Sequence, residues 1–308
     1  MTMTIRRHSV NGTSSGAPAL TGQAGSFIAV MDYCLVTGCG WTKEFSLSTT
    51  MATYRAPTGN RFRFAVDDTA TQNAVIRGLE VATTYGVLDA AGTQLFPTSG
   101  QVAAGLYHYK SSLADATARP WAFFSNGTAF YFLSTPTGAM GNFVGMFFGD
   151  TPSFKAGDTS NTAIVGSHAA NQSDRGLIAV SIAANASVIG HYLARSHTQV
   201  TGAVACGKSY EAHRAYGSTS MGAGGVNYPA PITGGMELGA CYANEVSIGI
   251  RARFPGLWNP LHPTAQLPST GDTFSGSGLL AGKTFEVFKL YGDTGCLVIE
   301  TSDTWGTY

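Results

Sequence analysis

The stretch PWAFFSNGTAFYFLS, residues 120–134, carries the strongest structural signal in the chain. Two runs rich in aromatic and β-prone residues flank the dipeptide Asn126-Gly127. Asparagine and glycine both accept positive φ, which the type I′ turn of a two-residue hairpin requires. Residues 121–134 are therefore predicted to form a β-hairpin with Asn126-Gly127 as its turn.

Period-two patterns elsewhere predict further antiparallel strands. In RFRFAV, residues 61–66, Phe62, Phe64 and Val66 share one face, and the two arginines share the other. Two more stretches alternate less regularly: AVIRGLEVA at 74–82 and GLYHYKS at 105–111. Near the C-terminus, TFEVFKLYGDTGCLVIET at 284–301 repeats the hairpin arrangement, with residues 292–295 as the turn. Both halves of the chain are therefore expected to be largely antiparallel β.

One helix is predicted, over residues 26–37. Its apolar residues fall at helical spacing: Phe27, Val30, Met31, Cys34 and Leu35. Ser26 is expected to cap the start of the helix, and Gly38 to end it. The apolar stripe is wide enough to be buried against a sheet.

Residues 1–22 are rich in Ser, Thr, Gly and Ala and have no apolar period, so they are expected to form an extended arm. Their apolar surface is too small to offset the entropy of ordering. We expect the arm to be mobile in the isolated protein and to lie across a neighbouring subunit in an assembly. Its anchors would be Ile5, Val10, Pro18 and Leu20, and deletion of the arm would leave the β domains folded.

The expected fold is thus mainly β, with two β-rich domains of antiparallel sandwich or barrel type, one short N-terminal helix and the extended arm. The first β-rich domain would comprise residues 23–154 and the second residues 155–308.

The composition points away from several classes of protein. Charged residues make up only 12% of the 308 residues, and the net charge is zero. A nucleic-acid partner would require clustered Lys and Arg, so none is expected. A membrane partner is not expected either, because no apolar run approaches the length of a span. With no apolar signal region at the N-terminus, we expect an unprocessed chain made in the cytosol. A surface so poor in charge favours coverage by other subunits.

Residues suited to catalysis or metal binding are not grouped in the sequence, so neither an enzyme nor a cofactor is expected. Six aspartates precede threonine, a pattern typical of turns: Asp68, Asp150, Asp158, Asp272, Asp293 and Asp303. Asp150 and Asp158 have a calcium site as their alternative reading. The five cysteines lack zinc spacing and are expected to be buried thiols. The histidines also lack zinc spacing.

RARFPGLWNPLH, residues 251–262, is interpreted as a fixed loop at a seam between domains or subunits, with purely internal packing as the alternative. Its two prolines stiffen it, and its tryptophan and arginines are residue types that dominate interfaces. The interface candidates are therefore Ile5, Val10, Leu20, Arg251, Arg253, Trp258 and His262.

Several segments taken together resemble an uncharacterised family of structural proteins of tailed bacteriophages and prophages. They are GAPALTGQAGSFIAVMDYCLVTG, ARPWAFFSNGTAFYFL, FFGDTPSFKAGDT, RARFPGLWNPLH and GDTFSGSGLLAGKTFEV with IETSDTW. The resemblance extends from about residue 16 to residue 305 and implies a virion component present in several copies. Its partners would be other copies of the chain and other virion proteins, and it supplies no catalytic residues.

The position within the particle stays open among tail, neck and capsid surface. We favour the tail or neck slightly, because the chain lacks the long charged helix and loop pattern of a shell-forming capsid protein. One alternative is a receptor- or glycan-binding module on the virion, with sugars stacking on Trp121, Tyr131 and Trp258. Another is a glycan hydrolase, for which Glu211, Glu237 and Glu245 are the available acids.

Overall fold

The computed structural model describes residues 6–8, 16–82, 94–140, 142–166, 190–202, 204–210, 227–245, 248–263, 266–290, 296–302 and 305. For residues 6–8 and 204–210 it describes the backbone alone. Over these residues the protein is mainly β with one short helix, as expected, and the named strands pair antiparallel.

Twelve strands form one hydrogen-bonded series in the order β1-β8-β9-β10-β11-β12-β13-β14-β15-β18-β17-β16. We call β1 and β8 to β12 the middle sheet and β14 to β18 the outer sheet; β13 pairs with both. The middle strands are β1 Arg6–His8, β8 Trp121–Ser125, β9 Ala129–Ser134, β10 Val144–Asp150, β11 Thr162–Val165 and β12 His191–Leu193. The others are β13 Val204–Tyr210, β14 Leu238–Glu245, β15 Gly249–Pro260, β16 Thr273–Ser275, β17 Thr284–Lys289 and β18 Cys296–Glu300.

A separate six-stranded sheet, which we call the helix-side sheet, lies between β1 and β8 in the chain. Its order is β2-β3-β4-β5-β6, and β7 also pairs with β5. Its strands are β2 Thr42–Ser48, β3 Met51–Arg55, β4 Arg63–Asp67, β5 Asn73–Leu79, β6 Leu95–Phe96 and β7 Leu106–Tyr109.

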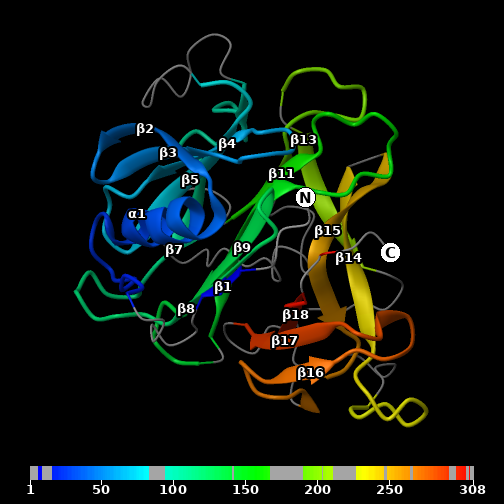
Figure 1. The fold of residues 1–308 in the computed structure, drawn as a ribbon. Helices are drawn as coiled ribbons and strands as arrows, with labels where there is room; N and C mark the ends of the chain where they lie inside the picture. Colours follow the sequence, from blue (N-terminus) through cyan, green and yellow to red (C-terminus); the bar gives the residue numbers. More distant parts are fainter. Residues whose placement is uncertain are drawn as a thin grey trace.

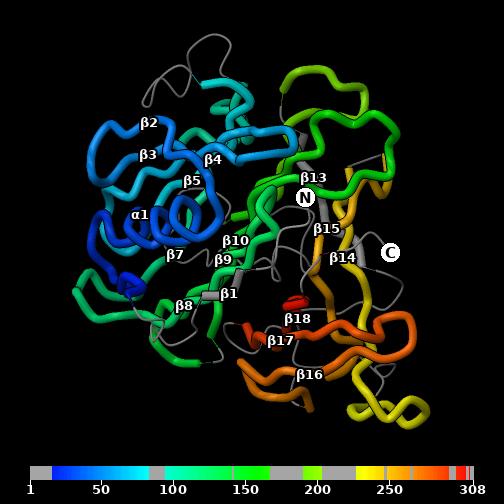
Figure 2. Tube along the Cα trace, in the orientation of Figure 1, coloured from blue at the N-terminus to red at the C-terminus, as the bar shows by residue number. Residues whose placement is uncertain are grey.

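The three sheets lie as layers, with the middle sheet between the other two (Figure 1). Figure 2 shows the same order from the blue helix-side sheet to the orange outer sheet. A core of buried side chains fills each contact between layers. Phe64 meets Phe130 on the helix side at 5.2 Å between ring centroids, and Phe147 meets Phe254 on the outer side at 5.1 Å.

The predicted hairpin at residues 121–134 is confirmed as β8 and β9, which pair from Trp121 with Ser134 to Ser125 with Phe130. Every residue of the two strands is buried. Alternate side chains enter opposite cores, with Phe123 toward the helix side and Phe124 toward the outer sheet. The two runs are apolar at nearly every position because both faces of the hairpin are covered.

The turn of this hairpin is not the predicted type I′. Gly127 has a φ of 92°, but Asn126 does not adopt positive φ. The side-chain oxygen of Asn126 instead accepts hydrogen bonds from the backbone N–H groups of Thr128 at 3.1 Å and Ala129 at 2.9 Å. Asn126 thus stabilises a longer turn through its side chain.

The other predicted strands are also present. β17 pairs with β18 from Phe285 with Glu300 to Lys289 with Cys296, while the predicted turn at 292–295 lies outside the described residues. The RFRFAV pattern corresponds to β4, in which Phe64 and Val66 are buried. The two less regular stretches correspond to β5 and β7.

The predicted helix is confirmed as α1 Ser26–Met31, which continues as the π-helical segment η1 Asp32–Gly38. All five residues of the predicted apolar stripe are buried. The prediction that Ser26 caps the helix is wrong. The cap residue is Gly25, with a φ of 79°, and the Ser26 hydroxyl donates to the backbone oxygens of Thr21 and Gln23.

Asp68 caps the helix instead, from the end of β4. Its Oδ2 accepts hydrogen bonds from the backbone N–H groups of Phe27 at 2.8 Å and Ile28 at 3.4 Å. Its Oδ1 pairs with Nζ of Lys110, and both side chains are completely buried. Burial raises the pKa of Asp68 to about 6, although Lys110 and the helix amides oppose the increase. Asp68 is therefore a buried ion-pair partner rather than the turn residue that the sequence predicts.

Two described parts of the expected arm contact their own chain. Arg6–His8 form β1, which pairs with β8. Leu20 is completely buried in the helix-side core and forms a β-bridge with Arg119. The burial of Leu20 therefore contradicts a mobile arm at that residue, whereas β1 is an extended segment, as expected for the arm. Leu20 belongs to the core, so deletion of residues 1–22 would also remove part of the fold.

The middle sheet is continuous across the expected domain boundary at residues 154 and 155. β10 lies before that boundary and β11 after it, and the two strands pair from Phe147 with Val165 to Asp150 with Thr162. Ser153 also forms a β-bridge with Ala252 of the outer sheet. The layers, rather than the two halves of the chain, organise the described residues.

Replacing Lys110 with Met tests the ion pair beneath α1. Methionine cannot neutralise Asp68, so we expect the free energy of unfolding to fall by about 3–5 kcal/mol near neutral pH. Without Lys110, the pKa of Asp68 in the folded state rises further above its unfolded value. The loss should therefore shrink as the pH falls through that raised pKa, because protonated Asp68 carries no buried charge. Urea titrations at about pH 5 and about pH 8 measure both effects.

Lys43→Met is the matched control, because Lys43 pairs with Asp32 at 2.9 Å but the two side chains are 26% and 39% exposed. Its loss should stay below about 1 kcal/mol and vary little with pH. Equal losses for the two variants would contradict a special role for the buried pair.

Candidate functional site

The stretch RARFPGLWNPLH lies mainly in β15, so its prediction as a loop is wrong. Every residue from 251 to 260 is buried. β15 pairs with β14 along one side, and Leu257 and Trp258 pair with β18 on the other. The stretch is therefore an interior strand of the outer sheet.

A β-bulge near the start of β15 places Arg251. Ala243 of β14 lies opposite Ala252, and Asn244 lies opposite Ile250, so Arg251 is an extra residue without its own partner in the pairing. A bulge re-aims the side chain of such a residue. The Arg251 side chain is only 2% exposed.

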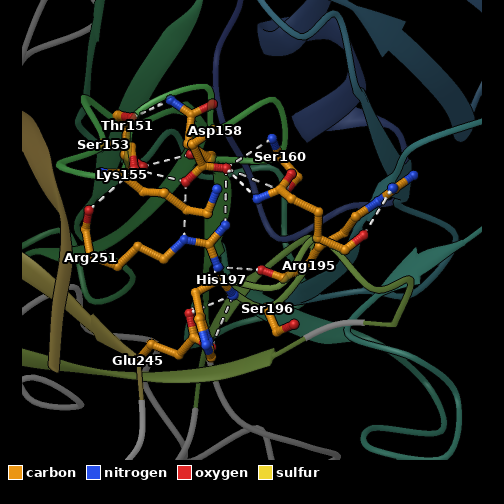
Figure 3. Close-up of polar contacts among 12 residues, drawn as sticks. Thr151, Ser153, Lys155, Asp158, Ser160, Arg195, Ser196, His197, Glu245 and Arg251 are labelled. Atoms are coloured by element: carbon orange, nitrogen blue, oxygen red, sulfur yellow. Dashed lines mark hydrogen bonds and ion pairs between the residues drawn. The ribbon is translucent and has the colours of Figure 1, made fainter. Parts of the chain in front are cut away.

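Arg251 binds two carboxylates (Figure 3). Its Nε and Nη2 donate to the two oxygens of Asp158, each at 3.0 Å. Its Nη1 donates to Oε2 of Glu245 at 2.9 Å and to the backbone oxygen of Arg195 at 2.6 Å. A planar guanidinium is suited to this arrangement, because its donors can reach several acceptors at once.

Hydrogen bonds keep both carboxylates ionised. Burial alone would raise the pKa of Asp158, but hydrogen bonds from Arg251, Ser153 and Gln199 outweigh burial and hold the pKa well below 3.8. Burial also acts to raise the pKa of Glu245, and hydrogen bonds from His197 and Arg251 lower it overall. Both acids therefore carry their charge inside the protein.

The network reaches the surface at His197, whose side chain is 42% exposed. Its backbone N–H donates to the two oxygens of Glu245 at 3.1 and 3.0 Å, and its Nδ1 lies 2.9 Å from Oε1.

Arg195 extends the network to the helix-side sheet. Its Nε donates to both oxygens of Glu80 at 2.9 Å, and Glu80 directly follows β5. We call Arg251, Asp158, Glu245, His197, Arg195 and Glu80 the Arg251 network. Its members come from the outer sheet, from the segments after β10 and β12 of the middle sheet, and from the helix-side sheet. The network is therefore a polar cross-link among all three layers.

Pro255 and Gly256 form a second irregularity in β15. Ala240 lies opposite Trp258 and Tyr242 opposite Arg253, so residues 254–257 of β15 face a single residue of β14. Gly256 has a φ of 66°, and a Cβ at this position would lie 2.3 Å from the Trp305 ring. The Tyr131 hydroxyl donates to the backbone oxygen of Pro255 at 2.9 Å. Proline within a strand is tolerated at such interruptions.

The other described interface candidates make internal contacts as well. The Arg253 guanidinium lies 4.4 Å from the centre of the Trp258 ring, a cation–π contact, and both residues are buried. His262 is buried, and its Nε2 accepts a hydrogen bond from the backbone N–H of Glu237 at 2.7 Å. Arg251, Arg253, Trp258 and His262 thus serve internal packing in this structure. Ile5 and Val10 lie outside the described residues.

The aspartates before threonine have several roles. Asp158 accepts the N–H of Ser160 at 3.1 Å, as a turn predicts, and Asp272 accepts the N–H of Ser269 at 2.7 Å. Asp150 accepts the N–H of Asn60 at 2.8 Å and the Thr162 hydroxyl at 2.6 Å, so it links two sheets. Asp293 and Asp303 lie outside the described residues. The calcium alternative is contradicted at Asp158, because the Arg251 guanidinium binds both of its oxygens.

Within the described ranges, no group of three or more His, Cys, Asp or Glu side chains could hold a metal ion. In the same part of the chain, no helix is long and apolar enough to cross a membrane. Four cysteines are free and buried, as predicted: Cys34, Cys39, Cys241 and Cys296.

The glycan-binding alternative is contradicted for the aromatics on which it depends. Trp121, Tyr131 and Trp258 are at most 6% exposed, and the other two tryptophans are also buried. For the hydrolase alternative, Glu211 lies outside the described residues, and Glu245 is held by Arg251 and His197.

Sequence reasoning missed most of the Arg251 network, namely Glu245 as the partner of Arg251, and His197, Arg195 and Glu80. One signal was available: Arg251 and Arg253 stand within a run of otherwise apolar residues, in a chain poor in charge. Arginines in such a run need acidic partners if the run is buried. The sequence does not show which acids those are.

No family model matches the chain, and no curated protein matches it at a significant level.

Replacing Arg251 with Met tests the cross-link among the layers. It would leave Asp158 and Glu245 buried without a counter-charge, so we expect a loss of about 3–5 kcal/mol in unfolding free energy near neutral pH. In the natural chain both acids have a lower pKa in the folded state than in the unfolded state. They therefore stabilise the fold at pH values above the unfolded-state pKa, and this stability is lost as the pH falls through the folded-state pKa. The loss caused by Arg251→Met should therefore shrink in acid. Urea titrations over a pH series measure it.

Arg251→Lys is the matched control, since it keeps the charge but lacks the geometry for several simultaneous hydrogen bonds. Its stability should lie between those of the natural chain and the Met variant. A Met variant as stable as the natural chain near neutral pH would rule out a structural role for the network.

Gly256→Ala should destabilise the protein more than Gly234→Ala. The two glycines have φ values of 66° and 68°, but a Cβ at residue 234 meets nothing within 4 Å. An alanine at either position has a backbone strain of about 1–2 kcal/mol. The clash with the Trp305 ring adds to this strain only at residue 256. Thermal unfolding of the two variants measures the difference, and equal midpoints would contradict the close approach of Trp305.

Proposed function

We propose that this protein is a structural component of a tailed bacteriophage particle. It assembles in multiple copies through contacts with itself and with other virion proteins, in the bacterial cytoplasm, and then stays in the virion. The tail or neck is favoured over the capsid surface as its position. In this proposal the protein acts by binding its neighbours, not by catalysis.

The surface carries this proposal. The chain has 18 basic and 18 acidic residues among 308, with no net charge to keep copies apart. Several large apolar side chains are exposed nonetheless, including Leu279 at 99%, Ile232 at 97% and Val200 at 65%. An exposed apolar side chain gains about 1.5–3 kcal/mol when a neighbour buries it fully. These properties suit a protein whose surface is covered by other subunits.

The exposed apolar side chains are spread over the molecule. Leu47 lies on β2, Phe154 follows β10, and Leu279 lies in the short helix η3 Gly278–Leu280 between β16 and β17. β2 and β16 are at opposite ends of Figure 1. Contacts on several sides are what a subunit within an assembly needs, because each copy touches more than one neighbour.

The interior also supports a structural role. The Arg251 network joins three layers through internal hydrogen bonds, and its acids are engaged with arginines of the same chain. Such a network holds the layers in fixed positions. The resemblance to phage structural proteins, stated above from the sequence, points to the same class.

The double variant Ile232→Lys/Leu279→Lys tests the proposal. Ile232 and Leu279 are almost fully exposed, so the two substitutions should not unfold the isolated chain. It should lower the copy number in particles, because lysines at a subunit contact cost desolvation energy. Particles are purified on a density gradient, and the chain is quantified against a major virion protein by mass spectrometry.

Thr233→Lys/Ser277→Lys is the control, since it adds the same charge at exposed polar positions within two residues of the tested ones. It should leave the copy number nearly unchanged. Complete absence of the natural chain from purified particles, despite its presence in the lysate, would overturn the proposed function.

A further inference from the structure

Two separate pieces of the N-terminal segment pair along the outer side of the chain from Arg119 to the end of β8. Leu20 forms a β-bridge with Arg119, just before β8 begins. β1 then covers β8 itself, with Arg6 opposite Ser125 and His8 opposite Phe123. Both pieces run antiparallel to β8.

The two pieces do not share one register. A continuous strand that pairs Leu20 with Arg119 would bring Ser14 opposite Ser125. The chain has Arg6 there instead, eight residues earlier. Eight residues can span up to about 27 Å when extended. The chain therefore has more length between the two pieces than pairing along one edge requires.

The edge of β8 must be filled by some strand. All five residues of β8 are buried, and β9 occupies only its other side. Backbone N–H and C=O groups left unpaired in a buried strand cost free energy, and an open edge pairs readily with other chains. β1 fills this edge with three residues.

We propose that, in the assembled protein, residues Arg6–His8 of one copy fill the β8 edge of a neighbouring copy. This inference rests on the proposed function, because it requires assembly in copies. The contacts between β1 and β8 are the same within one chain or between two, so exchange changes their free energy little. The surplus length lets the segment reach a neighbour, and close spacing in an assembly supplies the high local concentration that favours the exchange.

A second copy is the occupant that the structure supports, since among the described residues the segment that pairs with the outer side of β8 itself is the chain's own β1. Its register against β8 is defined over three residue pairs. Each exchanged segment would add a contact between subunits without any new interface surface.

The experiment uses two full-length single variants, Arg6→Cys and Ser125→Cys, co-expressed in cells that produce particles. Arg6 and Ser125 are direct partners across the two strands, within the spacing that a disulfide requires. Purified particles are oxidised, and disulfides between the two variants are identified by non-reducing gels and mass spectrometry. Since each chain carries one new cysteine, a disulfide between residues 6 and 125 can form only between different chains.

Ser48→Cys replaces Ser125→Cys in the control, because Ser48 lies on β2, an edge strand of the helix-side sheet. We expect at least about tenfold more disulfide with residue 125 than with residue 48, since pairing raises the local concentration of the two thiols. The natural chain, with its own cysteines, gives the background.

Ser125 is buried, so a cysteine there could prevent folding, and a second variant tests the exchange without changing that residue. Arg7→Pro/His8→Pro removes at least one N–H group that faces β8, because successive amides in a strand point to opposite sides. The isolated variant should keep its circular dichroism spectrum but lose incorporation into particles. Thr2→Pro/Met3→Pro, ahead of β1, should incorporate normally.

Particles that contain the chain but show no disulfide between the two variants would overturn the exchange and leave the proposed function standing. The double variant Arg6→Cys/Ser125→Cys would then give only a link within one chain. Absence of the chain from particles would overturn the proposed function, and the exchange with it.

Discussion

Burial of the middle sheet on both faces is the constraint on which the rest of the structure depends. β8 and β9 send aromatic side chains alternately into two cores, so neither face can be left to water. A sheet with two apolar faces needs a covering layer on each. The helix-side sheet with α1 provides one layer, and the outer sheet provides the other. The order of the three layers thus follows from the composition of one hairpin.

The same burial determines where charges can lie. Asp68 and Lys110 are completely buried beneath α1, and Arg251 is buried with Asp158 and Glu245 near the junction of the layers. A buried charge without a partner costs several kcal/mol, so each of these groups is paired and hydrogen bonded. The chain has few charged residues, and those that are paired in the interior further reduce the number of charges on the surface. This links the internal architecture to a surface suited to contact with other subunits.

The middle sheet ends at the outer edge of β8, which β1 covers. Both faces of β8 are buried, and the N-terminal segment supplies the strand β1 that pairs with its outer edge. Three residue pairs join β1 to β8, so few contacts must break when this segment moves to another copy. Assembly and folding would then use the same backbone hydrogen bonds.

The sequence by itself determined the local structure: the mainly antiparallel β class, the hairpin at 121–134, and the helix that begins at Ser26. These features depend on neighbouring residues, whose periodicity and turn chemistry are visible in the chain. Only the tertiary structure decided that β15 continues past Pro255 and Gly256, because the irregular pairing with β14 tolerates the proline and the missing Cβ of Gly256 leaves room for the Trp305 ring. It alone decided that Asp68 caps α1 and that Arg251 joins Asp158, Glu245 and, through Arg195, Glu80. Partners such as Arg251 and Asp158 lie 93 residues apart, and their pairing follows from the stacking of layers, which no local pattern records.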